Sequence, residues 1–187
     1  MSKYTGKVQR MATLTAPNRT IVAVLFLVGG ALQVLGAVLG LVNAGNSGAF
    51  YLLSNLVLGV GFVLMFAWFA TTTIARVAYL IAAVGWLLLA LGGLVNVAFL
   101  GTLGVFVAVV GSLFAGVIVF TGRVFGRQTD ILFLAAMIAG ALNLLISQNS
   151  NVPGVLKAIV VVVFGALLVV WAVLLLGKRT SKATTAR

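Results

Sequence analysis

The side chains that most enzymes use for acid–base, nucleophilic or metal chemistry are almost missing from this sequence. It has no His and no Cys, and Asp130 is its one acidic residue. Disulfides, imidazole metal sites and imidazole acid–base catalysis are therefore excluded, and so are mechanisms that need two carboxylates. We predict no catalytic site, no cofactor and no metal site, and we expect that the protein is not an enzyme.

The polar side chains that interrupt the apolar runs are mostly amides. They recur at helical spacing beside small residues, so that three of the runs carry a small-residue stripe with an amide near one end. One interpretation, which we prefer, is a set of helix-packing seams whose amides hydrogen-bond across them. The other is a polar vestibule that opens outward. The candidate residues for both are Gln33, Asn43, Asn55, Asn96, Asn143 and Ser147.

Glycines lie on the same helix faces as these amides. Gly36 and Gly40 form a small-x-x-x-small pair, which lets two helix backbones approach closely. The candidate helix-packing residues are Gly36, Gly40, Gly85, Gly92, Gly111, Gly140 and Gly165.

Two charges lie near the ends of apolar runs. Lys157 is about one turn inside the last run, so we expect it to extend to the lipid headgroups, with an anion or substrate role as the alternative. Asp130 is expected in the first turn of a helix, where a carboxylate suits the helix dipole, and it could pair with Arg127. With no acid at mid-membrane, the chain is a poor candidate for an ion-coupled carrier, whereas passive permeation stays open.

Six long apolar runs must position these side chains. The chain is 63% hydrophobic and 7% charged, whereas soluble domains are roughly half apolar and a quarter charged. The runs approach the ~20 residues that a membrane helix needs, and they do not alternate as barrel strands would. We predict an all-α, polytopic six-helix domain over 20–177 between basic tails at 1–19 and 178–187. The expected spans are 20–42, 49–70, 76–98, 101–121, 130–148 and 154–177.

Basic residues predict the orientation of these spans. The net charge is +11, and joints that carry arginine alternate with uncharged joints. By the positive-inside rule both ends of the chain are cytoplasmic. We expect contacts with anionic lipid headgroups rather than nucleic acid, and a second copy or a membrane protein is a further candidate partner. The candidate headgroup contacts are Arg19, Arg76, Arg123, Arg127, Lys178 and Arg179.

Similar segments begin at positions 30, 85 and 140: Gly-Ala-Leu-Gln-Val-Leu, Gly-Trp-Leu-Leu-Leu-Ala and Gly-Ala-Leu-Asn-Leu-Leu. They indicate either three repeated helical hairpins in one membrane orientation or only a shared composition. Six spans in fewer than 200 residues, with Gly-rich hairpins and both ends inside, resemble the HdeD-like (DUF308) small membrane proteins of bacteria. The resemblance covers the layout of all six spans and implies a link to acid-stress resistance. No site residue is carried over from that family.

The Ala/Val/Leu/Gly-rich composition and short tails suggest a bacterial plasma membrane. The expected function is that of a non-enzymatic structural, stress-related or accessory component that packs against itself or a membrane partner. The alternative is a passive channel or facilitator for a small neutral solute, which would use the amide-lined vestibule. A lipid-binding scaffold is a third hypothesis, based on the basic inner face.

Overall fold

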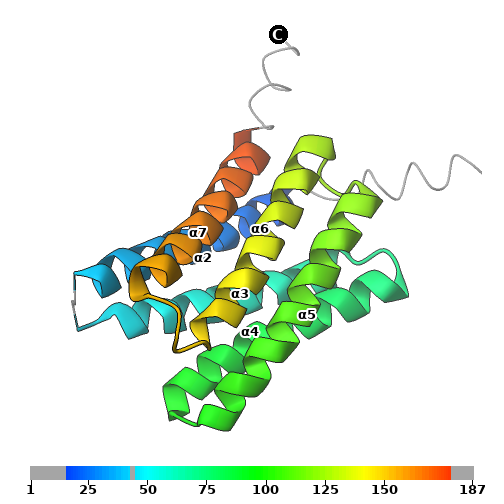
Figure 1. Ribbon diagram of the computed structural model, residues 1–187. Coiled ribbons are helices and arrows are strands. Elements are labelled where there is room, and N and C mark those ends of the chain that lie inside the picture. Colours follow the sequence, from blue (N-terminus) through cyan, green and yellow to red (C-terminus); the bar gives the residue numbers. More distant parts are fainter. Residues whose placement is uncertain (1–15, 43–44, 178–187) are drawn as a thin grey trace, which may run out of the picture.

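The computed structural model describes residues 16–42 and 45–177, and within them it contains helices and no strand (Figure 1). All six helices are long and apolar enough to cross a membrane. This confirms the all-α, multi-pass prediction. In chain order the helices are α2 (Ala16–Leu41), α3 (Ser47–Phe69), α4 (Thr73–Val95), α5 (Ala98–Gly122), α6 (Arg127–Ser147) and α7 (Gly154–Gly177).

The helix ends follow local backbone chemistry. The hydroxyl of Thr72 accepts a hydrogen bond from the Ala75 N–H at 3.1 Å, which satisfies one unpaired donor at the start of α4. Asn96 ends the same helix in the left-handed conformation with φ 53°, and its N–H donates to the Gly92 carbonyl. Short connections of this kind make consecutive helices antiparallel.

The six helices pack as a closed ring. Each helix contacts the next one along the chain, and the ring is completed by contact between α2 and α7. Figure 1 shows these two helices, blue and orange, side by side at one edge of the bundle. Neighbours in the ring are therefore α2, α3, α4, α5, α6 and α7 in order, with α7 returning to α2.

The tightest seams of the ring are made by glycines. A Cβ atom on Gly85 of α4 would collide with the backbone of Ala108 on α5, and one on Gly111 would collide with Ala82. On the other side of the ring, a Cβ on Gly30 of α2 would lie 2.7 Å from the Gly165 carbonyl oxygen of α7. These helices approach so closely because no side chain separates their backbones.

An aromatic core fills the interior of the ring toward one end of the bundle. Phe26, Phe62, Phe133 and Trp171 come from α2, α3, α6 and α7, and the centroids of Phe133 and Trp171 are 4.9 Å apart. Phe26 lies edge-on to Phe62 at 5.2 Å and to Trp171 at 5.4 Å. Such edge-to-face contacts stabilise aromatic clusters beyond their buried area. All four residues lie toward the end of the bundle that carries the arginine-containing joints.

The outer surface of the ring is apolar on every helix. Leu35, Val63, Leu80, Phe106 and Val163 are among the large hydrophobic side chains that point outward and stay exposed. An apolar surface of this extent would drive aggregation in water, whereas in a bilayer it faces lipid chains. The bundle is thus built for lipid on the outside and for its own side chains on the inside.

Candidate functional site

A cavity of about 630 Å³ lies inside the ring, at the end opposite the aromatic core. The second halves of α2, α4 and α6 and the first halves of α3, α5 and α7 enclose it. Phe164 follows the lining residue Val161 by one turn of α7 and stacks on Trp86 with centroids 5.8 Å apart. Along α7, this stacked pair therefore lies between the cavity lining and Trp171 of the aromatic core. Its lining residues are Gln33, Ala37, Gly40, Leu41, Tyr51, Asn55, Leu89, Val105, Asn143, Leu144, Ser147, Gln148, Gly154, Val155, Lys157, Ala158 and Val161.

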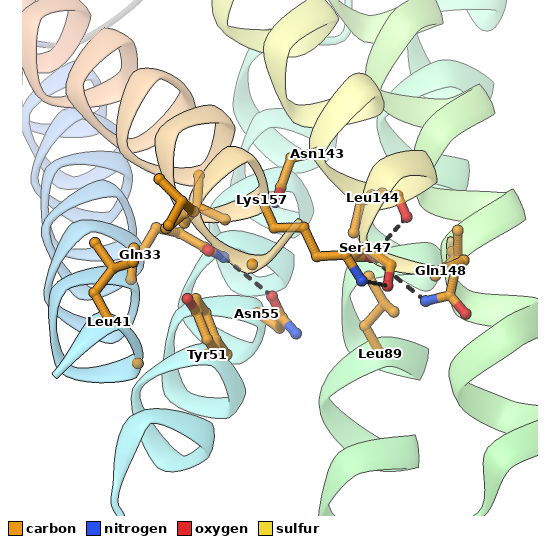
Figure 2. Close-up of a pocket in the computed structure, with 17 residues that line it drawn as sticks. Gln33, Leu41, Tyr51, Asn55, Leu89, Asn143, Leu144, Ser147, Gln148 and Lys157 are labelled. Carbon is orange, nitrogen blue, oxygen red and sulfur yellow. Dashed lines mark hydrogen bonds between the residues drawn. The ribbon is translucent and has the colours of Figure 1, made fainter. Parts of the chain in front are cut away.

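Two of the predicted amides meet on one wall of the cavity. The Nε2 of Gln33 on α2 donates to the Oδ1 of Asn55 on α3 across 3.4 Å (Figure 2). The side chain of Gln33 is only 2% exposed, so the ring holds it in place. This bond uses one donor of Gln33 and one acceptor of Asn55, and both residues line the cavity.

Asn143 on α6 is the third amide of the cavity. Its side chain is 7% exposed and makes no hydrogen bond with the residues that the structure describes. A buried amide without a protein partner is costly unless water or a ligand satisfies it. Asn143 therefore marks a position where the cavity has unused hydrogen-bonding capacity.

Lys157 spans the cavity rather than leaving the bundle. It belongs to the first turn of α7, is half-buried, and its Nζ donates to the Ser147 carbonyl oxygen of α6 at 3.3 Å (Figure 2). An ammonium group suits this position, because the last carbonyls of a helix lack intrahelical partners. Nearby, the Ser147 hydroxyl donates to the Leu144 carbonyl at 2.7 Å.

The other predicted polar residues lie elsewhere. Asn96 is exposed at the end of α4, where it caps the helix and does not line the cavity. Asn43 lies outside the described residues. The structure thus brings together Gln33, Asn55 and Asn143, with Ser147 at the rim, and leaves Asn96 apart.

Most of the predicted packing glycines lie against a neighbouring helix. Gly85 and Gly111 form the α4–α5 seam, and a Cβ on Gly92 would lie 2.6 Å from the Gly101 nitrogen. Added Cβ atoms would also meet the Tyr51 ring at Gly36, the Phe164 ring at Gly140 and the Gly30 carbonyl at Gly165. Gly40 differs, because it lines the cavity and a Cβ there would make only ordinary contact with Ser47.

The predicted headgroup contacts that the structure describes lie at the other end of the bundle. Arg76, Arg123 and Arg127 are exposed there, and Arg19 is half-buried with an Nε that has no hydrogen-bond partner among the described residues. Lys178 and Arg179 lie outside the described residues. Asp130 is fully buried beside these arginines, and its carboxylate accepts hydrogen bonds from the backbone N–H groups of Phe125 and Gly126.

Three polar lining residues, Tyr51, Gln148 and Lys157, were not among the predicted site residues. Lys157 was expected to extend to the headgroups, whereas its Nζ donates to the Ser147 carbonyl oxygen. The signal that could have identified Lys157 is its status as the one charge inside an apolar run. Nothing in the pattern indicates that its side chain turns toward α6.

The cavity can therefore offer amide, hydroxyl and ammonium hydrogen bonds, and its lining contains no carboxylate that could ligate a metal ion. Its remaining walls are aliphatic and come from Ala, Leu and Val. Searches of known proteins add no assignment: no family model, no curated protein and no solved structure matches this chain.

Proposed function

We propose that this protein is a non-enzymatic facilitator that admits a small solute from one side of the membrane into the amide-lined cavity. The observation that carries the proposal is the convergence of Gln33, Asn55 and Asn143 on one open space inside a closed helix ring. A volume of about 630 Å³ falls within the 300–1,000 Å³ typical of ligand sites. In this proposal the cavity opens outward, and the aromatic core fills the inner half of the bundle.

The orientation in the membrane is part of the proposal. The described arginines lie at the end opposite the cavity, and by the positive-inside rule that end is cytoplasmic. The cavity then opens to the exterior, and the arginines contact anionic headgroups. A bacterial plasma membrane, and a stress-related role of the kind that the HdeD-like resemblance implies, are consistent with this arrangement.

The alternative proposal is a structural, stress-related or accessory component that packs against itself or a membrane partner. It is supported by the stripes of small residues, of which Gly85, Gly111 and Gly165 pack against helices of the same chain. The glycines are therefore accounted for without a second protein.

Flux through proteoliposomes tests the proposal. The Gly40→Phe substitution places an aromatic ring in the cavity mouth, where only ordinary contacts await a new side chain. The matched control is Gly48→Phe, at the same end of the bundle but outside the cavity, where a Cβ meets nothing within 4 Å. Entry of glycerol, urea and short organic acids into the vesicles is followed by light scattering.

We expect protein-dependent flux of at least one of these solutes in the wild type and in Gly48→Phe. Flux should fall at least about tenfold in Gly40→Phe, because the ring blocks the opening. The absence of protein-dependent flux, or equal flux in the two variants, contradicts the facilitator proposal and returns the packing proposal to first place.

A further inference from the structure

The cavity lining carries a positive charge and no negative charge. Lys157 is the one charged residue of this lining. The chain's one acidic side chain, Asp130, lies at the opposite end of the bundle, where the N–H groups of Phe125 and Gly126 hold its carboxylate. No acidic side chain can therefore neutralise Lys157 from within the chain. Lys157 as a residue is half-buried, and a charged side chain at the cavity without an acidic partner favours an anion that enters the cavity.

Lys157 retains N–H donors that can bind such an anion. An ammonium group has three N–H donors, and the described contact with the Ser147 carbonyl uses one of them. Figure 2 shows the side chain reaching across the opening from α7 toward the end of α6, beside Ser147 and Gln148. Asn143, one helical turn deeper on α6, adds an amide that has no described partner.

The other lining residues indicate that most of the ligand is apolar. Leu89, Val105, Leu144, Ala158 and Val161 form aliphatic walls below the polar groups. Such walls favour an apolar chain over a second charge or a sugar, since burying unpaired polar groups there costs free energy. One cation, a few amides and an aliphatic wall together describe a small amphipathic ligand.

We infer that the solute of the proposed facilitator is an organic anion with a single negative charge and an apolar body, such as a monocarboxylate. Its carboxylate lies between Lys157 and Asn143, and its apolar chain lies against Val105, Leu144 and Val161. This inference rests on the proposed function, and it replaces the neutral solute expected from the sequence with an anionic one. The same chemistry is available from two sources, a short-chain acid in solution or a fatty acid from the bilayer.

Binding to the purified chain in lipid nanodiscs tests the inference. The first comparison is between hexanoate and hexanamide, which have the same carbon chain and differ in charge. The second is between hexanoate and oleate, which separates the soluble source from the membrane source. Titration calorimetry gives the affinity for each ligand in the wild type and in Lys157→Gln, Lys157→Arg and Arg127→Gln.

We expect one of the two carboxylates to bind at least about tenfold more tightly than hexanamide, because charge-assisted hydrogen bonds are the stronger ones. Lys157→Gln should remove this preference and Lys157→Arg should keep most of it. Arg127→Gln, which removes an exposed charge at the other end, should leave binding unchanged. The comparison of ligands in the wild type holds even if a variant fails to fold.

Equal binding of hexanamide and the carboxylates, or no binding of either carboxylate, overturns the inference. So does a charge preference that survives in a folded Lys157→Gln protein. None of these results bears on the facilitator proposal. That proposal is contradicted only if protein-dependent flux is absent or is equal in Gly40→Phe and Gly48→Phe. The two proposals can therefore fail separately.

Discussion

The indole N–H of Trp86 on α4 donates a hydrogen bond to the Ser112 hydroxyl on α5, with Nε1 and Oγ 3.0 Å apart. Both side chains are 1% exposed, so the bond lies between two helices that already touch through glycines. Trp171, in the aromatic core, is equally buried, but its Nε1 has no partner among the described residues. The two tryptophans thus form a natural comparison between a bonded and an unbonded indole.

Replacement of Trp86 by Phe should destabilise the bundle more than replacement of Trp171 by Phe. Both changes remove a similar volume, but Trp86→Phe also leaves the Ser112 hydroxyl unpaired. We expect the difference in unfolding free energy to be about 1 kcal/mol, the usual net value of a hydrogen bond. Denaturation in mixed micelles measures it. Equal losses in the two variants would show that the Trp86–Ser112 bond contributes nothing.

Alanine at Gly111 should weaken the α4–α5 seam. The new methyl group would collide with the backbone of Ala82, which cannot rotate away as a side chain can. Overpacking of this kind costs about 1–3 kcal/mol in unfolding free energy.

The matched control is Gly101→Ala, on the same helix, where a Cβ meets nothing within 4 Å. We expect it to be neutral or slightly stabilising, since alanine favours helix over glycine. Thermal unfolding in detergent compares the two variants. If Gly111→Ala and Gly101→Ala unfold at the same temperature, the backbones of α4 and α5 are not in direct contact at this seam.

Loss of the Asp130 carboxylate should loosen the turn between α5 and α6. Its two oxygens accept from Phe125 N at 2.9 Å and Gly126 N at 3.1 Å, and Gly126 has a positive φ of 103°. Asp130→Ala leaves both donors without this acceptor and should cost about 2 kcal/mol, whereas Asp130→Asn, which keeps one acceptor oxygen, should cost less. Unfolding free energies of the two variants and of the exposed control Gln128→Ala give the order. Asp130→Ala as stable as the control would refute the role.

Single cysteines should report the orientation of the bundle. The chain has no native cysteine, so each introduced thiol is read without background. Asn151 and Thr71 are both exposed in connections between helices, and they lie at opposite ends of the bundle. We expect a membrane-impermeant maleimide to label Asn151→Cys in intact cells and Thr71→Cys only after permeabilisation. The reverse pattern would place the cavity on the cytoplasmic side.

The sequence predicts the helices well because its apolar runs are continuous and the joints between them are short. Asn96 separates α4 from α5, since Asn readily adopts the left-handed cap. The start of α2 is different: the helix begins at Ala16 and passes through Pro17 before the apolar run begins. Proline is tolerated in a first helical turn, so the polar residues there do not stop the helix.

The cavity is harder to predict from the sequence than the helices are. The spacing of apolar and polar residues gives the depth of a residue in the membrane, but not its neighbours across the helix ring. Asn96 and Asn143 have the same side chain near the same end of their helices, yet only Asn143 lines the cavity. From the sequence, helix-packing seams are preferred to a vestibule. The glycines form the seams, while Gln33, Asn55 and Asn143 remain beside open space.

Contact between α2 and α7 has a consequence for biosynthesis. Gly30 and Gly165 meet across the seam that closes the ring, although most of the described chain separates them in sequence. At translation rates of roughly 5–20 residues per second, a time on the order of ten seconds passes between the synthesis of α2 and the synthesis of α7. During that time α2 has no α7 to pack against, so the ring is open at this seam. We therefore expect the last step of assembly to be a lateral movement of α7 within the bilayer.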